Sequence, residues 1–99
     1  MATITKKDLA DRIAEWSGAS HLLTRRIVHE FLGEIVAELI KGNRLEFRDF
    51  GVFETRIRAA RTAQNPKTLE RVQVPAKRAV KFRAGRLVKQ KLNGQAFEQ

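Results

Sequence analysis

The 99-residue sequence contains no cysteine, no tyrosine and only two prolines. Without cysteine the chain can form neither a disulfide framework nor a cysteine-ligated zinc site, and it has no thiol nucleophile. It also has no apolar run near the roughly 18–20 residues that a membrane-spanning helix requires. Residues 1–7 lack the apolar segment of a signal peptide, so we expect a cytoplasmic protein.

Residue patterns that form catalytic sites are also missing. His21 and His29 are expected to be solvated, and they lie about 12 Å apart along a helix, too far for joint metal ligation. Asp49-Phe50-Gly51 matches the metal-binding triplet of protein kinases, but the other kinase motifs are absent from the sequence. Neither a phosphate-binding glycine loop nor a nucleophile elbow is present. We therefore expect no enzymatic activity, no metal, no cofactor and no small-molecule substrate.

Acidic residues are nearly absent from one segment, which makes the charge distribution uneven. The chain has 20 basic and 11 acidic residues, a formal charge of +9. Residues 1–55 hold 8 basic and 9 acidic residues, whereas residues 56–91 hold 12 basic residues and one acid, Glu70. Like charges this close repel one another unless a ligand supplies counter-charges. The pattern predicts a polyanionic partner, against the simpler alternative of an ordinary basic surface.

Helical periodicity dominates the first half of the sequence. Thr5 and Asp8 have the spacing of a capping box, and apolar residues then repeat at helical intervals. Ser20 is placed to cap a second helix over 21–41, which ends at Gly42-Asn43. The apolar positions of this second helix cover about half of its circumference, whereas packing against one small sheet needs roughly 100°. We therefore predict a dimer whose core is shared between two chains.

From residue 44 the sequence alternates with the period of two that strands require. Two antiparallel strands are predicted over 44–58, joined by a turn at Asp49-Phe50-Gly51 in which Gly51 is free to take a positive φ. A third strand is predicted over 72–82, with Pro75 at an edge or bulge. A basic helix over 84–92 and a frayed tail over 93–99 follow.

Residues 59–71 contain almost no bulky apolar side chains and cannot contribute to a core. They are also too many for a compact hairpin loop of about 2–5 residues. We predict an extended β-ribbon arm over 59–71 that bends at Asn65-Pro66, because proline cannot donate to a strand ladder. A disordered loop that becomes ordered on binding is the alternative for the free protein.

Together these elements predict an α+β fold in a single domain over 1–99. It comprises a helical part over 5–42, a three-stranded antiparallel sheet over 44–58 and 72–82, an arm over 59–71 and a C-terminal helix over 84–92.

Three segments of the chain resemble the HU/integration host factor family of bacterial histone-like DNA-binding proteins. They are 44–53 (RLEFRDFGVF), 58–68 (RAARTAQNPKT) and 82–86 (FRAGR), within a resemblance that covers about 5–93. The resemblance implies two chains intertwined into a helical body, with two protruding β-arms that wrap the minor groove of DNA. It also implies a proline wedge at each arm tip, matched by Pro66, and a nucleoid-associated protein that supports DNA condensation, recombination, replication or transcription.

The arm tip departs from the family pattern G-R-N-P-x-T-G. Gln64 stands where the family has an arginine that acts as a minor-groove cation, and Ala63 and Leu69 stand where it has glycines. We expect the change at Gln64 to weaken binding or alter sequence preference, and the loss of both glycines to stiffen the tip.

Residues 44–48 resemble the β-type subunits of integration host factor more than they resemble HU. In those subunits, the residues that match Glu46 and Arg48 help to read a preferred sequence. The alternative is that Glu46 and Arg48 form an ordinary surface ion pair, either across strands or with each other at i,i+2.

The predicted DNA-binding residues are cations and arm-tip residues placed to contact phosphates or the minor groove. They are Lys6, Lys7, Arg48, Arg56, Arg58, Arg61, Gln64, Asn65, Pro66, Lys67, Thr68, Arg71, Lys81, Arg83, Arg86 and Lys89. The arm arginines are expected to follow the backbone from one face of a ribbon, where side chains repeat every second residue. Exposed N–H groups at the starts of the first and last helices should add anion contacts. Pro66, rigid and apolar, is the predicted intercalating wedge.

The predicted function is that of a homodimeric or heterodimeric architectural protein that bends double-stranded DNA. An RNA-binding or ribosome-associated basic protein is the chief alternative, although the chain lacks the clustered aromatics that stack on unpaired bases. A membrane-surface protein would need exposed apolar residues on its basic C-terminal helix. We expect the apolar side chains of that helix to pack against the body of the protein instead; they are Leu87, Val88 and Leu92.

Overall fold

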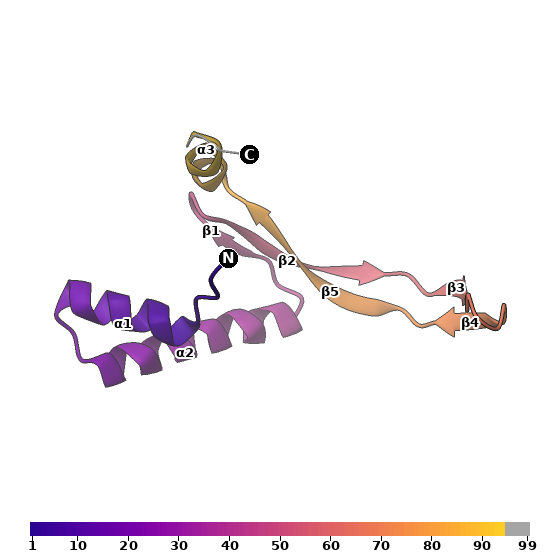
Figure 1. The fold of residues 1–99 in the computed structure, drawn as a ribbon, viewed down its shortest axis with the longest axis horizontal. Coiled ribbons are helices and arrows are strands. Elements are labelled where there is room, and N and C mark those ends of the chain that lie inside the picture. The colour runs from indigo at the N-terminus through magenta and orange to yellow at the C-terminus, as the bar shows by residue number, and fades with distance from the viewer. Residues whose placement is uncertain (95–99) are drawn as a thin grey trace. The chain divides into compact units, whose positions relative to one another are not determined.

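The computed structural model describes residues 1–94, in which three helices and five strands occur. They are α1 (Lys6–Ser17), α2 (His21–Ile40), β1 (Leu45–Phe47), β2 (Gly51–Arg58), β3 (Arg61–Gln64), β4 (Arg71–Val74), β5 (Lys77–Ala84) and α3 (Arg86–Gly94) (Figure 1). The chain divides into two compact units, Met1–Glu38 and the residues from Leu39 onward. No helix within residues 1–94 is both long and apolar enough to cross a membrane.

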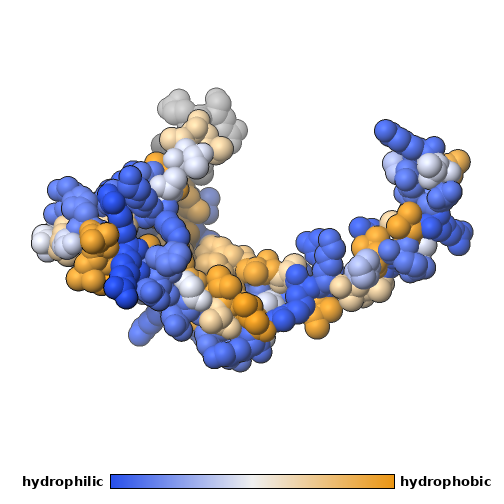
Figure 2. Space-filling view, turned by 90° about the horizontal axis from the view of Figure 1, so that it is seen from below, coloured by the Kyte–Doolittle hydropathy of each residue, from blue (hydrophilic) through white to orange (hydrophobic). Residues whose placement is uncertain are grey.

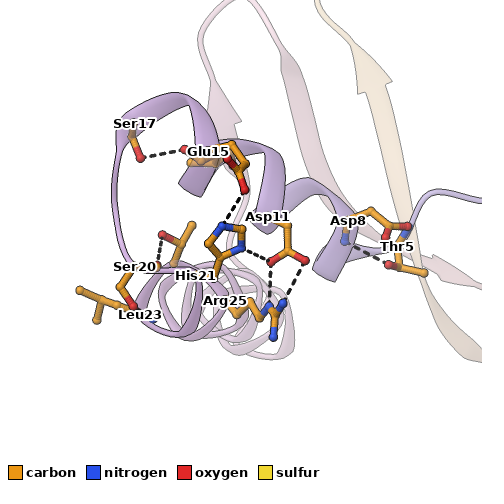
Figure 3. A network of polar contacts seen from close by, with 11 residues as sticks. Thr5, Asp8, Asp11, Glu15, Ser17, Ser20, His21, Leu23 and Arg25 are labelled. Atoms are coloured by element: carbon orange, nitrogen blue, oxygen red, sulfur yellow. Dashed lines mark hydrogen bonds and ion pairs between the residues drawn. The ribbon is translucent and has the colours of Figure 1, made fainter.

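Both helices of the first unit begin as predicted. The Asp8 N–H donates to Thr5 Oγ1 (3.2 Å) and the Thr5 N–H donates to Asp8 Oδ2 (3.0 Å), which completes the capping box. At the end of α1, Gly18 has a φ of 74°, a left-handed conformation that glycine adopts without steric cost. Ser20 Oγ then accepts from the Leu23 N–H (3.2 Å), and α2 follows (Figure 3). The capping residues thus determine where each helix starts.

A polar network joins α1 to α2. Arg25 donates through Nε and Nη2 to the two carboxylate oxygens of Asp11, at 2.8 and 3.0 Å (Figure 3). His21 lies between two acids, with Nδ1 3.2 Å from Asp11 Oδ1 and Nε2 2.9 Å from Glu15 Oε1. His29 Nδ1 lies 2.7 Å from Lys6 Nζ. Both histidines are exposed, as expected, but they pair with α1, which periodicity along one helix could not indicate.

The network makes the stability of this unit depend on acid pH. Hydrogen bonds from Arg25, with a smaller contribution from His21, lower the pKa of Asp11 from 3.8 to about 2. Because the folded-state pKa is lowered, the stabilisation is complete above about pH 4 and is lost as the pH falls towards 2. We expect Asp11→Asn to reduce the fall in Tm between pH 4 and pH 2, measured by circular dichroism. Arg25→Gln should reduce it similarly, and an unchanged pH profile in both variants would contradict the assignment.

The second unit contains the predicted antiparallel sheet, in the order β1-β2-β5. Its register places Phe53 of β2 opposite both Leu45 and Phe82. The strand predicted over 72–82 is instead two strands, β4 and β5, and this correction follows from Pro75. Proline has no N–H to donate, so the ladder stops at residues 75–76, and β4 pairs with β3 in a separate two-stranded ribbon.

Gly51 does not use the freedom to take a positive φ that the sequence suggested. In the β1–β2 turn it is Asp49 that has a positive φ, of 68°, a conformation that aspartate tolerates better than most residues. Gly51 belongs to β2 and lies opposite Ala84 of β5. A Cβ at position 51 would lie 2.5 Å from the Arg83 carbonyl oxygen and 2.6 Å from Phe82 Cε1. Glycine is required here because β5 approaches the backbone closely.

One face of the sheet is apolar, because side chains alternate along each strand. This apolar face is formed by Leu45, Phe47, Phe53, Ile57, Val80 and Phe82. The rings of Phe53 and Phe82 have centroids 4.7 Å apart, and Phe50 from the adjacent turn lies 5.4 Å from Phe82. Even so, Phe50 and Phe82 remain exposed, so the aromatic cluster is open on one side.

Few side chains are buried within the single chain. Among the described residues, the buried hydrophobic residues are Ala10, Ala14 and Leu39, and no large side chain is fully buried. On α2, Ile27 is 57% and Val36 55% exposed. Hydrophobic patches are accordingly visible at the surface in Figure 2. Each unit therefore presents apolar surface that its own residues do not cover.

The C-terminal helix begins two residues later than predicted and extends to Gly94. It starts after Gly85, whose N–H donates to the Phe50 carbonyl at 2.7 Å. Val88 is half-buried, but Leu92 stays exposed, so only part of the predicted packing of this helix is present. Of the predicted tail over 93–99, the first two residues are helical, and residues 95–99 lie outside the described part of the chain.

Candidate nucleic-acid interface

The second face of the sheet, here called the cationic face, gathers basic side chains from β2 and β5. The register pairs Arg58 with Lys77 and Glu54 with Lys81, and side chains directly opposite share a face. The residues of the cationic face are Glu46, Val52, Glu54, Arg56, Arg58, Lys77, Ala79, Lys81 and Arg83. Five of these are cations, and one of the two acids, Glu54, lies 3.4 Å from Arg83 Nε. The face therefore retains a surplus of positive charge.

The structure brings four predicted residues together on this face and adds a fifth. Arg56, Arg58, Lys81 and Arg83 were predicted as DNA-binding residues, and Lys77 was not. Lys77 alternates with Ala79 and Lys81, a signal that was already present in the predicted strand over 72–82.

The neighbouring cation, Arg78, faces the other way. Its Nη2 donates to the carbonyl oxygens of Leu39 and Ile40, both at 2.9 Å. These carbonyls belong to the last turn of α2, where the helix itself supplies few donors, and the Leu39 carbonyl also accepts from the Gly42 N–H (3.0 Å). Arg78 thus caps a helix within the second unit, whereas Lys77 contributes to the cationic face.

The predicted arm is a β-ribbon in the structure. β3 pairs with β4 so that Arg61 lies opposite Val74 and Gln64 lies opposite Arg71 (Figure 1). Because Arg61 and Gln64 are three residues apart, their side chains lie on opposite faces of the ribbon. The expectation that the arm arginines act from one face is therefore wrong for Arg61 and Arg71, whereas Arg56 and Arg58 do share a face.

The tip of the ribbon is a hydrogen-bonded turn around Pro66. The Asn65 N–H donates to the Glu70 carbonyl (2.9 Å), and the Leu69 N–H donates to the Asn65 carbonyl (2.7 Å). The Lys67 N–H donates to Asn65 Oδ1 (2.9 Å). Asn65 therefore organises the turn, and Pro66 follows it directly at the end of the ribbon.

Two of the departures from the family pattern are linked at this tip. Leu69 occupies the position of a family glycine and has a φ of 61°. A residue with a side chain adopts this left-handed conformation at a cost of about 1–2 kcal/mol. Gln64, in place of the family arginine, donates through Nε2 to the Leu69 carbonyl (3.2 Å). The side chain at 64 is thus used to hold the backbone at 69.

The remaining predicted residues lie outside the sheet and the arm. Lys6 and Lys7 occupy the first turn of α1, where they line a shallow depression with Ala10 and Arg25. The N–H group of Asp8 at this helix start is already bonded to the Thr5 hydroxyl, so fewer free donors are present than predicted.

Arg48, Arg86 and Lys89 are exposed, the first in the β1–β2 turn and the other two on α3. No ion pair joins Arg48 to Glu46 among the described residues, so the ordinary surface pair is not observed.

Within residues 1–94, no group of three or more histidine, aspartate or glutamate side chains is placed to hold a metal ion.

Comparisons with known proteins agree with this geometry. Residues 4–93 match the family model described as "Bacterial DNA-binding protein". The chain is 34% identical over 98 residues to integration host factor subunit alpha of Acinetobacter baumannii, which covers 99% of this chain and 100% of that protein. It is 40% identical over 90 residues to a probable DNA-binding protein HU of Chlamydia pneumoniae, covering 90% of each.

Solved structures show the same fold. A cocrystal structure of Anabaena HU with DNA matches with a TM-score of 0.82 and 32% identity, covering 90% of this chain and 97% of that one. A mutant HU from Thermotoga maritima matches with a TM-score of 0.66 and 27% identity, covering 90% and 99%. The likeness of residues 44–48 to β-type subunits stays a prediction from that motif. By its sequence and its fold, the chain belongs to the HU/integration host factor family of bacterial DNA-binding proteins.

Proposed function

We propose that this chain is an architectural protein that binds the minor groove of double-stranded DNA as a dimer and bends the duplex. The observation that carries the proposal is the continuity of the cationic face with the ribbon. Only residues 59–60 and 75–76 separate β2 from β3 and β4 from β5, so the two charged strands lead directly to Pro66. Cations on the sheet would bind phosphates, while the tip reaches into the groove.

A dimer is supported by the apolar surface that each unit leaves uncovered. The exposed side chains of α2 and the open aromatic cluster of the apolar face together form too much hydrophobic surface for a stable isolated chain. Burial between two chains would remove this surface from water and place two ribbons in one assembly. A dimer was predicted from the second helix, and the partner is a second copy of this chain or a related subunit.

The charge of the dimer is sufficient for bending. Smooth bending of a duplex of about 20–30 base pairs costs about 1–6 kcal/mol, and each unstacked base step costs a few more. Each chain has a formal charge of +9, and phosphate neutralisation releases counterions that favour binding. In the proposed function the protein binds DNA in the nucleoid and performs no catalytic step. The relatives reported above favour DNA over the RNA-binding alternative, and competition between matched duplexes distinguishes the two.

Pro66→Ala tests the wedge directly. We expect the variant to lose most of the bend but only a modest part of its affinity, because alanine keeps the phosphate contacts and cannot unstack a base step. Sedimentation equilibrium first establishes that the species has twice the 11.3 kDa chain mass. Energy transfer between dyes at the ends of a duplex of about 30 base pairs then reports the bend.

The other proline provides the matched control for this experiment. Pro75 lies at the break between β4 and β5 and not at the tip, so Pro75→Ala should retain much more of the bend than Pro66→Ala does. Equal losses of bend and affinity in Pro66→Ala would argue against a wedge. A wild-type protein that binds the duplex without shortening its end-to-end distance would remove the bending function itself.

A further inference from the structure

Leu69 is the single large apolar side chain between residues 64 and 71, and it is 68% exposed. Its φ of 61° lies in the region that favours glycine. Both of its backbone groups are held, since the N–H donates to the Asn65 carbonyl (2.7 Å) and the carbonyl accepts from Gln64 Nε2 (3.2 Å). Strained backbone conformations of this kind cluster at functional sites, where the strain serves ligand binding. The strain at Leu69 therefore points to a contact that its side chain makes with a bound ligand.

The surroundings of Leu69 indicate what it contacts. Pro66 precedes it by three positions in the same turn, and Lys67 and Thr68 between them are exposed and polar. An apolar group bordered by polar and cationic groups matches a kinked minor groove, in which an unstacked base step exposes apolar base faces beside phosphates. Figure 2 shows the same mixture, with mostly hydrophilic residues and isolated hydrophobic atoms at the far end of the ribbon.

We propose that Leu69 is a second apolar contact of the arm tip, which enters the minor groove beside Pro66, and that Gln64 positions it. The inference rests on the proposed DNA-bending function. It gives one role to two departures from the family pattern, because Gln64 and Leu69 are the two ends of a single hydrogen bond. The cation lost at position 64 is compensated by apolar contact at position 69.

The Leu69→Gly substitution distinguishes loss of the proposed DNA contact from loss of protein stability. Glycine relieves the backbone, so the Tm of the free protein should equal or exceed that of the wild type. Affinity for a dye-labelled duplex should fall about tenfold, which corresponds to about 1.4 kcal/mol, and the bend should decrease. The salt dependence of binding should not change, because no phosphate contact is lost. Val72→Thr, at another exposed apolar residue of the ribbon, is the control and should bind as wild type.

Gln64→Ala tests the positioning role. We expect it to weaken binding about threefold alone and to have little further effect in the Leu69→Gly background, because it acts through Leu69. Wild-type affinity and bend in Leu69→Gly would overturn the inference while leaving the DNA-bending function intact. If the wild type itself fails to bend the duplex, the proposed function is lost, and this inference with it.

Discussion

Replacing Arg58 and Lys77 with alanine is expected to weaken duplex binding by about 10³- to 10⁴-fold near 0.1 M salt. The two side chains lie directly opposite each other on the cationic face. In a dimer the double variant loses four phosphate contacts, and each contact contributes about 0.9 to the slope of log K against log salt. The slope should therefore decrease by about 3–4, and the affinities of variant and wild type should converge towards 1 M salt. Fluorescence anisotropy titrations at several salt concentrations measure both quantities.

Arg78 provides the contrast, since it is adjacent to Lys77 but faces α2. Arg78→Gln removes a cation of the same strand together with the hydrogen bonds to Leu39 and Ile40. We expect a lower Tm with little change in the salt slope. If Arg78→Gln lowered the slope as much as the Arg58 and Lys77 substitutions do, the division of charge between the two faces would be wrong.

Among the substitutions of a glycine by alanine in this chain, Gly51→Ala is expected to lower the stability most. The new Cβ would meet the Arg83 carbonyl oxygen at 2.5 Å, and backbone cannot move aside as a flexible side chain can. Overpacking of this kind costs about 1–3 kcal/mol. Each kcal/mol lowers the Tm of a domain of this size by about 4–8 °C, which thermal unfolding followed by circular dichroism would detect.

The control for Gly51→Ala is the same substitution at Gly94. A Cβ there would have no neighbour within 4 Å, and its φ is not in the left-handed region. Gly94→Ala should therefore leave the Tm close to that of the wild type. A Gly51→Ala variant as stable as Gly94→Ala would show that β5 can shift away from β2 at little cost.

Local signals in the sequence were sufficient to predict most of the helices and strands. The Thr5 and Asp8 capping box, the end of α2 before Gly42 and the alternating strands around Phe53 were all predicted and are confirmed. In each case the decisive interaction lies within a few residues along the chain. The asymmetric charge of residues 56–91 likewise identified the segment that forms the cationic face.

What could not be predicted depends on register and on contacts between elements. The partners of Arg78, the carbonyls of Leu39 and Ile40, lie almost forty positions earlier in the chain, so its role in capping α2 could not be read from the alternation of β5. Arg61 and Arg71 lie on opposite faces of the ribbon because the register pairs Arg61 with Val74 and Arg71 with Gln64. The need for glycine at position 51 arises from the approach of β5, more than thirty positions later in the chain. Periodicity contains no information about such distant neighbours.

The interruption of both ladders between the sheet and the ribbon has a mechanical consequence. Ladder pairing stops after Arg58 and Lys77 and resumes at Arg61 and Val74. Residues 59–60 and 75–76 therefore form no cross-strand pair in either ladder. Rotation there breaks fewer bonds than rotation anywhere within a ladder, and Pro75 prevents its own backbone from restoring one. Each arm can therefore change its angle at low cost while its tip remains rigid. One pair of arms could in this way engage duplexes of different curvature and groove width.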